Sequence, residues 1–254
     1  MATYTSQPAK LFARQVLRTN VYSRPNPSLF FVPGLNTKPY YDNHSQFGFV
    51  KDFEQNYETI KKEYLALKES YGDQDDYKKI QNEHTLNKGG WSWMNYVSKG
   101  QKVNQEQFKK HCPVTTDLLE NSIRQSGHRL MTHTPFSYSF FSTMKPGTQI
   151  SPHYGATNIK LRCHFPIIIP DEAFLSVAGD PRPWKEGKMT IFDDSYEHEA
   201  ANLSKTSERV LLLIDIWHPE LHDEEVDQIK SMFLQIEEMI KKRQQQAQQS
   251  AKQS

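Results

Sequence analysis

The pattern of apolar and polar positions divides the chain into a helical first part and a strand-rich second part. From Phe53 to Leu67 apolar residues recur at intervals of three and four, which predicts an amphipathic helix. From Phe136 onward the period falls to two, and short strands alternate with turns rich in Pro and Gly. The run from Arg209 to Trp217 is almost wholly apolar, as in a strand buried on both faces. This pattern predicts a mainly β fold, a sandwich or jelly roll, with helices packed outside.

The same pattern predicts four segments along the chain. Residues 1–27 contain Pro, Ser and Asn without periodicity, so we expect a flexible arm. Residues 28–222 are expected to form one domain, with its helical part first. Helical spacing returns over residues 223–242, which predicts an amphipathic helix that packs on the domain or pairs with another chain. The Gln-rich residues 243–254 are expected to be disordered.

Composition and charge exclude several classes of protein. The net charge is only +1, so we expect no nucleic acid partner. No apolar run reaches the length of about 18 residues that a transmembrane segment needs. Cys112 and Cys163 are the only cysteines, which excludes a disulfide framework and makes the cytoplasm the default location. Because no acidic residue precedes Asp42, targeting to an organelle is the alternative.

Two histidines of the strand-rich part are candidate metal ligands. His153 and His198 fall on different predicted strands, which a barrel can bring together, and imidazole is a good ligand for iron. The position two residues after His153, where a carboxylate ligand is usual, is occupied by Gly155. Because a lone histidine is more often structural than a ligand, spacing alone leaves the metal site open.

Two arginines strengthen the case for a ligand. Arg162 and His164 share one face of a predicted strand, and Arg209 begins the buried strand. A guanidinium that enters a core needs a negatively charged partner. A dicarboxylate cosubstrate would supply that charge, whereas the alternative is pairing with the acidic side chains of residues 193–197.

These motifs together resemble the aspartyl/asparaginyl β-hydroxylase domain over most of residues 28–222. The resemblance is carried by the His153-Tyr154-Gly155, Arg162-Cys163-His164, Phe192–Glu199 and Asp215–Leu221 segments, together with Arg209. Members of this family are Fe(II)- and 2-oxoglutarate-dependent oxygenases on a double-stranded β-helix, a jelly-roll or cupin-like barrel. They bind iron through two histidines and no carboxylate, so Gly155 agrees with the resemblance.

The resemblance implies roles around the metal. His153 and His198 would hold Fe(II), and Asp194 would hydrogen-bond a metal-bound water. Arg162 and His164 would contact the carboxylate of 2-oxoglutarate that lies near the metal, and O2 would be the oxidant.

The resemblance also implies roles farther from the metal. Ser142 and Arg209 would bind the distal carboxylate of 2-oxoglutarate, and Trp91 would be an aromatic residue of that pocket. Lys160 occupies the position where well-studied animal enzymes carry an arginine that binds the substrate carboxylate, and lysine lacks the bidentate fork.

The implied reaction is hydroxylation of an unactivated carbon, the β-carbon of an Asp or Asn residue in a peptide or protein. The same chemistry on a lipid acyl chain or a small molecule is an alternative. Halogenation is another, since Gly155 is expected to leave room for chloride. A barrel that binds ligands without catalysis is the non-enzymatic alternative. The sequence leaves the oligomeric state open.

Overall fold

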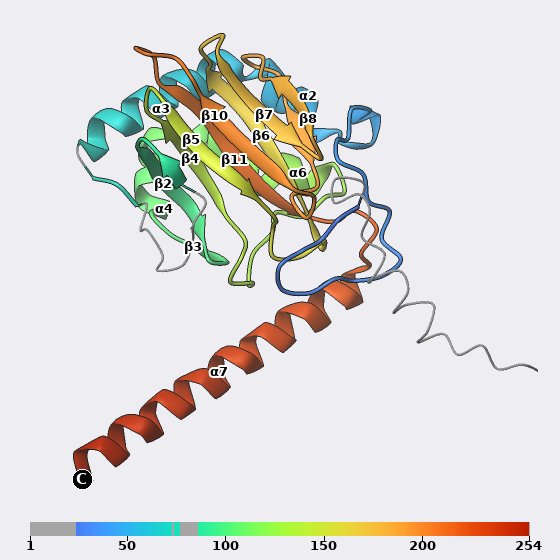
Figure 1. Ribbon diagram of the computed structural model, residues 1–254, viewed down its shortest axis with the longest axis vertical. Coiled ribbons are helices and arrows are strands. Elements are labelled where there is room, and N and C mark those ends of the chain that lie inside the picture. Colours follow the sequence, from blue (N-terminus) through green and yellow to red (C-terminus); the bar gives the residue numbers. More distant parts are fainter. Residues whose placement is uncertain (1–23, 73, 77–85, 254) are drawn as a thin grey trace, which may run out of the picture.

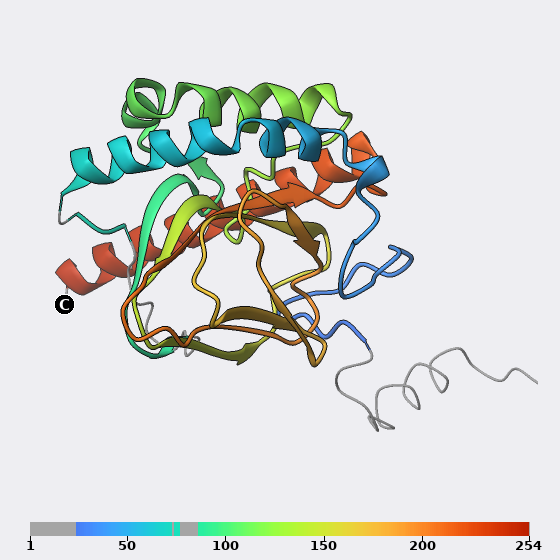
Figure 2. The same cartoon turned by 90° about the horizontal axis from the view of Figure 1, so that it is seen from above.

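A computed structural model describes residues 24–72, 74–76 and 86–253. Two antiparallel sheets face one another and form the body of the molecule (Figures 1 and 2). Residues 1–23 of the predicted N-terminal arm lie outside the described ranges. Residues 24–27 run beside the barrel, where the backbone N–H of Asn26 donates to the carbonyl of Ser195 at 2.8 Å.

The strands form two sheets, and the chain passes between them several times. One sheet has the order β3-β2-β4-β11-β6-β9, and the other has the order β1-β5-β10-β7-β8. From β4 to β11 the chain crosses repeatedly from one sheet to the other, which is the topology of a double-stranded β-helix, or jelly roll. The predicted mainly β fold is therefore confirmed. The strands are β1 (Leu86–Lys88), β2 (Trp91–Ser98), β3 (Gln101–Lys102), β4 (Ser139–Met144), β5 (Thr148–His153), β6 (Lys160–Ile168), β7 (Ala173–Val177), β8 (Asp180–Pro183), β9 (Thr190–Phe192), β10 (His198–Asn202) and β11 (Arg209–Trp217).

A layer of helices covers the outer face of the six-stranded sheet (Figure 2). The helix expected from Phe53 to Leu67 is present, although it is divided at Asn56 into two shorter helices. The helices before the C-terminal one are η2 (His44–Gln46), α2 (Phe49–Gln55), α3 (Tyr57–Tyr71), α4 (Gln105–His111), α5 (Pro113–Asp117), η3 (Leu118–Ser122) and α6 (Ile123–Gln125).

Strand β11 lies between two apolar cores and shows how the site is placed. Val210, Leu212 and Ile214 pack toward the helical layer, whereas Leu211 and Leu213 pack between the sheets. Both faces are buried, which explains the continuous apolar run. Because side chains alternate along a strand, Arg209 and Asp215 belong to the series that points between the sheets.

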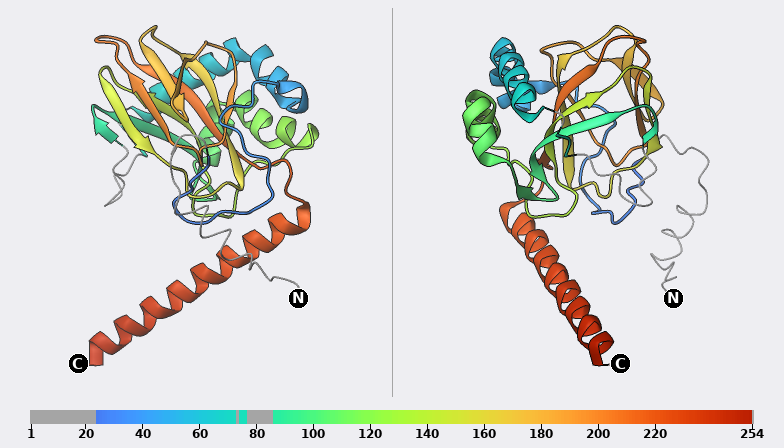
Figure 3. Two further views of the ribbon diagram at one scale, coloured as in Figure 1. Left: turned by 45° about the vertical axis from the view of Figure 1, so that its right-hand side comes forward. Right: turned by 90° about the vertical axis from the view of Figure 1, so that its left-hand side faces the viewer.

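The C-terminal helix α7 (Asp223–Gln253) begins against the barrel and then projects away from it (Figure 3). Val226 and Phe233 are buried in its first turns, close to Phe30 and Phe136. The helix continues to Gln253, past residue 242, where the sequence predicted the start of a disordered tail. Gln, Ala and Lys lose little side-chain freedom in a helix, which explains the extension. Within the described ranges, no helix combines the length and the apolar character that crossing a bilayer would require.

Candidate active site

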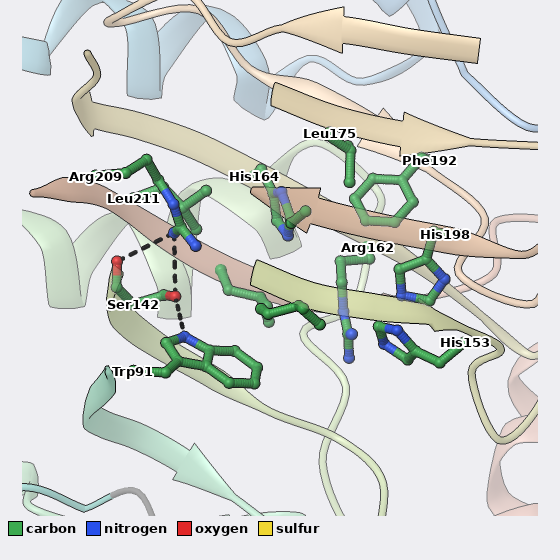
Figure 4. Close-up of a pocket in the computed structure, with 13 residues that line it drawn as sticks. Trp91, Ser142, His153, Arg162, His164, Leu175, Phe192, His198, Arg209 and Leu211 are labelled. Atoms are coloured by element: carbon green, nitrogen blue, oxygen red, sulfur yellow. Dashed lines mark hydrogen bonds between the residues drawn. The ribbon is translucent and has the colours of Figure 1, made fainter. Parts of the chain in front are cut away.

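His153 and His198 form a directly opposed pair across β5 and β10. The two residues occupy one rung of the antiparallel ladder, and their ring centroids lie 4.1 Å apart. Residues opposite each other in a sheet present their side chains on the same face, so strand pairing alone brings the two imidazoles together. Figure 4 shows both rings at one end of the pocket between the sheets.

The hydrogen bonds of the two imidazoles leave one nitrogen of each ring available. Nδ1 of His153 donates to the carbonyl of Ser151 at 2.8 Å, and Nδ1 of His198 donates to the carbonyl of Tyr196 at 3.0 Å. Burial lowers the pKa of both rings, that of His198 well below 6.5. Two neutral imidazoles, each oriented by a backbone carbonyl, are the form in which histidine binds a metal.

The carboxylate of Asp194 occupies the space beside Gly155. A Cβ atom built on Gly155 would lie 2.5 Å from Oδ1 of Asp194, so only glycine fits here without movement. The Oδ1 atom is buried and accepts no hydrogen bond from the described residues. The room that Gly155 was expected to leave for chloride is therefore filled by Asp194. An acceptor without a donor, close to two neutral imidazoles, fits a metal centre whose bound water could donate to it.

Asp194 also belongs to a closed ring of four alternating charges, Lys160, Asp194, Arg162 and Asp215. Asp194 lies 3.0 Å from Nζ of Lys160 and 3.2 Å from Nη1 of Arg162. Asp215 lies 2.8 Å from Nζ of Lys160 and 2.8 Å from Nε of Arg162. Although burial alone would raise the pKa of Asp194, the two cations hold it below its usual value. The alternative pairing of Arg162 with an acidic side chain is thus present, with Asp215 as the partner that sequence patterns missed.

Lys160, predicted to bind the substrate, makes its contacts within the protein. Its side chain is 2% exposed, and its ammonium contacts Asp194, Asp215 and the carbonyl of Phe136. An ammonium has three N–H donors, so these three acceptors can occupy all of them. The structure therefore places Lys160 at the outer pocket described below, but without a free donor for a substrate carboxylate.

Arg209 lies at the opposite end of the pocket and has no such partner. It is 2% exposed, and within the described residues no carboxylate oxygen lies within 4 Å of its guanidinium. Its Nη1 donates to the hydroxyl and the carbonyl of Ser142, whereas its buried Nε has no hydrogen-bond acceptor among these residues. Burial lowers the pKa of Arg209 to about 9, which shows how poorly the charge is compensated. A buried, uncompensated cation calls for an anionic ligand.

Ser142, Trp91 and His164 complete the inner wall of this pocket. Trp91 Nε1 donates to Ser142 Oγ at 2.8 Å, and Arg209 donates to the same oxygen at 3.1 Å (Figure 4). Because Ser142 accepts both bonds, its own hydroxyl hydrogen is available to a ligand. Nδ1 of His164 is buried without a hydrogen-bond partner among the described residues, and burial lowers its pKa well below 6.5. The seven metal-ligand and cosubstrate residues predicted from the sequence all line this pocket, whereas Asp194 lines the adjoining one.

Two connected cavities surround these residues. The inner pocket extends from the histidine pair to Arg209, with apolar walls that include Phe192 and Leu211. The outer pocket is the larger of the two. The two share His153 and Arg162 among their lining residues, so the end of the inner pocket with the histidine pair adjoins the outer pocket.

Sequence patterns missed two residues that shape the site. Asp215 could have been suspected, since it is the one acid within the apolar run of β11. Trp184 carried no such signal, yet its ring lies 5.0 Å from the guanidinium carbon of Arg209. A cation over an aromatic face is a favourable contact, so Trp184 supports the otherwise uncompensated arginine.

The chain matches the family model described as aspartyl/asparaginyl β-hydroxylase over residues 54–219. It is 33% identical over 209 residues to aspartate β-hydroxylase domain-containing protein 2 of Xenopus tropicalis. The aligned region covers 82% of this chain and 54% of that protein. It is 35% identical over 201 residues to the aspartyl/asparaginyl β-hydroxylase of Mus musculus, which covers 76% of this chain and 25% of that protein. The chain thus spans about half, or less, of the length of these relatives.

Solved structures give weaker similarities. A Burkholderia pseudomallei oxidoreductase of the 2OG-Fe(II) oxygenase family has a TM-score of 0.44 at 12% identity, over 66% of this chain and 91% of that one. A Pseudomonas putida prolyl-4-hydroxylase has a TM-score of 0.39 at 13% identity, over 66% of this chain and 98% of that one. The sequence matches are the stronger finding, and they show that this chain belongs to the aspartyl/asparaginyl β-hydroxylase family.

Proposed function

We propose that this protein is an Fe(II)- and 2-oxoglutarate-dependent hydroxylase that acts on the β-carbon of an Asp or Asn residue in a peptide or protein. The observation that carries the proposal is the pairing of two features in one pocket. At one end are two neutral imidazoles with free nitrogens, and at the other is a buried guanidinium without a carboxylate partner. A small dicarboxylate that also contacts a metal would satisfy both ends.

The donor set fits the proposed cofactors. In this proposal His153 and His198 would be the two protein ligands, because their rings are paired and each keeps one nitrogen free for a metal. Imidazole is a common ligand of ferrous iron. The inner pocket extends from the histidine pair to Arg209, the two places that a small dicarboxylate bound to a metal would contact. When bound, Fe(II) and 2-oxoglutarate supply the oxidising power needed to hydroxylate an unactivated C–H bond with O2.

In this proposal the side chains of the protein bind and orient 2-oxoglutarate. Arg209 and the hydroxyl of Ser142 would donate to the distal carboxylate, and Arg162 and His164 would contact the end near the metal. Oδ1 of Asp194 would accept a hydrogen bond from a metal-bound water. The apolar walls of the inner pocket keep bulk water away from the reacting atoms, which strengthens each of these polar contacts.

Anaerobic titration with Fe(II) and 2-oxoglutarate, followed by measurement of succinate release on admission of O2, tests the proposal. We expect His198→Ala to abolish metal-dependent binding and to lower succinate release by more than about 100-fold, because a ligand is lost. His218→Gln is the matched control, since His218 is equally buried but lines neither pocket. Absence of binding in the wild-type protein would refute the proposal.

Arg209→Met tests the dicarboxylate separately from the metal. Removing the cation that faces a buried carboxylate should raise the Kd for 2-oxoglutarate by at least about 30-fold, the equivalent of about 2 kcal/mol. Binding of the metal alone should be unchanged, because Arg209 lies at the other end of the pocket. If the variant binds 2-oxoglutarate as tightly as the wild type, Arg209 is not the distal anion site.

The outer pocket supports a second candidate, the same chemistry on an acyl chain or an aromatic small molecule. Its walls include Trp93, Phe136, Tyr138 and Phe140, and the rings of Trp93 and Phe140 are stacked with centroids 4.3 Å apart. Such a surface favours apolar groups. Mass spectrometry after incubation with Asp or Asn peptides and, in parallel, with acyl substrates distinguishes the two candidates by which product gains one oxygen.

A further inference from the structure

Asp215 is a buried carboxylate to which the proposed reaction assigns no part. It lies on β11 directly opposite Arg162 of β6, and its side chain is fully buried. It is absent from the residues that line the inner and outer pockets. Asp215 therefore contacts neither ligand, although its neighbour Arg162 lines both pockets.

The contacts of Asp215 fix Arg162 in one orientation. Its two oxygens accept from Nε of Arg162 at 2.8 Å and from Nη2 at 3.0 Å. These nitrogens form one edge of the guanidinium, so the bidentate pair determines the plane of the whole group. The carboxylate is itself held by the backbone N–H of Tyr138 at 3.1 Å and by Lys160 at 2.8 Å.

We propose that Asp215 is a positioning residue, which anchors Arg162 in the orientation in which its guanidinium meets the cosubstrate carboxylate near the metal. This inference rests on the proposed function, because it concerns the same pocket. Arg162 lies beside His153 in the inner pocket (Figure 4). With Nε and Nη2 held by Asp215, its third nitrogen, Nη1, lies 3.2 Å from Asp194, so the two carboxylates together fix the plane of the guanidinium.

Lys160 has a matching part in the inference. Two cations and two carboxylates form the ring, so the charges of Asp194 and Asp215 are balanced only while Lys160 and Arg162 are both present. Lys160 supplies the second cation of the ring through its contacts with both carboxylates.

Asp215→Asn tests the inference through two readouts, the free energy of unfolding in urea without metal and the Kd for 2-oxoglutarate with Fe(II) under anaerobic conditions. The variant should lose stability, since two cations then share one carboxylate, and its Kd should rise about 10-fold as Arg162 turns toward Asp194. The sign of the change is informative. Removing a negative charge near an anion site would by electrostatics alone tighten binding, so weaker binding reports lost orientation.

The double variant Asp215→Asn with Lys160→Met separates positioning from stability. It restores the balance of charge, so most of the lost stability should return, whereas the Kd should stay raised because the anchor of Arg162 is still missing. A Kd that recovers together with stability, or one that Asp215→Asn leaves unchanged or lowers, would overturn the inference. If Asp215→Asn does not fold, the charge-balanced double variant carries the same test; if neither folds, the role is purely structural and the inference fails. Wild-type protein that binds no 2-oxoglutarate would instead refute the proposed function, and the inference with it.

Discussion

The pocket contains two buried arginines with opposite surroundings. Arg162, near the histidine pair, lies within a ring of four charges that compensate one another. Arg209, at the far end, has a serine and an aromatic ring as neighbours, and burial lowers its pKa. The first arginine is stabilised by the fold, whereas the second lacks a counter-charge that only a ligand would bring. A buried cation therefore indicates a binding site when the chain does not compensate it.

The largest expected effect comes from neutralising the two arginines separately. Arg162→Met leaves Asp194 and Asp215 with Lys160 alone, and breaking a buried ion pair in this way costs about 3–5 kcal/mol of stability. Arg209→Met removes an uncompensated charge, so the ligand-free protein should be as stable as the wild type or more so. Urea unfolding without metal measures both. Equal losses in the two variants would contradict the distinction between a compensated and an uncompensated arginine.

A smaller loss of stability is expected from Gly155→Ala, which disturbs only the end of the pocket where the charges of Arg162 and Asp194 compensate one another. The added Cβ would lie 2.5 Å from Asp194 Oδ1 and would force the carboxylate to move, at a cost of about 1–3 kcal/mol. Gly155 does not have a positive φ, so the contact alone is responsible. Gly48→Ala is the control, because its new Cβ would meet Ser126 at 3.3 Å, outside the site. Unchanged stability and succinate release in Gly155→Ala would show that Asp194 is freely displaced.

The smallest effect is on the pH dependence of stability, and it comes from His164, which lines the inner pocket together with the histidine pair and Arg209. Burial, followed by the charges of Arg209 and Arg162, lowers its pKa well below 6.5. The unfolded chain therefore takes up a proton more readily than the folded one, and the stability present above pH 6.5 is lost as the pH falls below it. His164→Gln should reduce this loss by at most about 1.4 kcal/mol per pH unit. Unfolding of both proteins one unit above and one unit below pH 6.5 gives the difference, and equal pH dependence would show that His164 titrates normally.

Strands of the barrel could be predicted from the sequence where the hydrophobic pattern of a single strand is distinctive. The boundaries of β11 coincide with the run from Arg209 to Trp217, because both faces of the strand are buried and all its residues except Arg209 and Asp215 are apolar. The end of α7 was less accessible, since Gln-rich sequences are compatible with both helix and disorder.

The sequence could predict which residues lie in the candidate site, but not which side chains contact one another there. Alternation along β6 places Lys160, Arg162 and His164 on one face, yet it does not say which residue lies opposite them. Asp215 reaches Arg162 through the register of two strands far apart in sequence. The ring contacts that engage Lys160, and the packing of Asp194 against Gly155, likewise depend on tertiary contacts that no local pattern encodes.

The position of His153 and His198 on one rung has a mechanical consequence. Strands β5 and β10 lie at the centre of the five-stranded sheet, and their register shifts just after this rung. An ion bound by both rings would cross-link the two strands next to the point where their hydrogen-bonded register is irregular. Loading the site would then suppress local opening of this sheet, so amide protons of β5 and β10 should exchange more slowly, while those of α7 should not change.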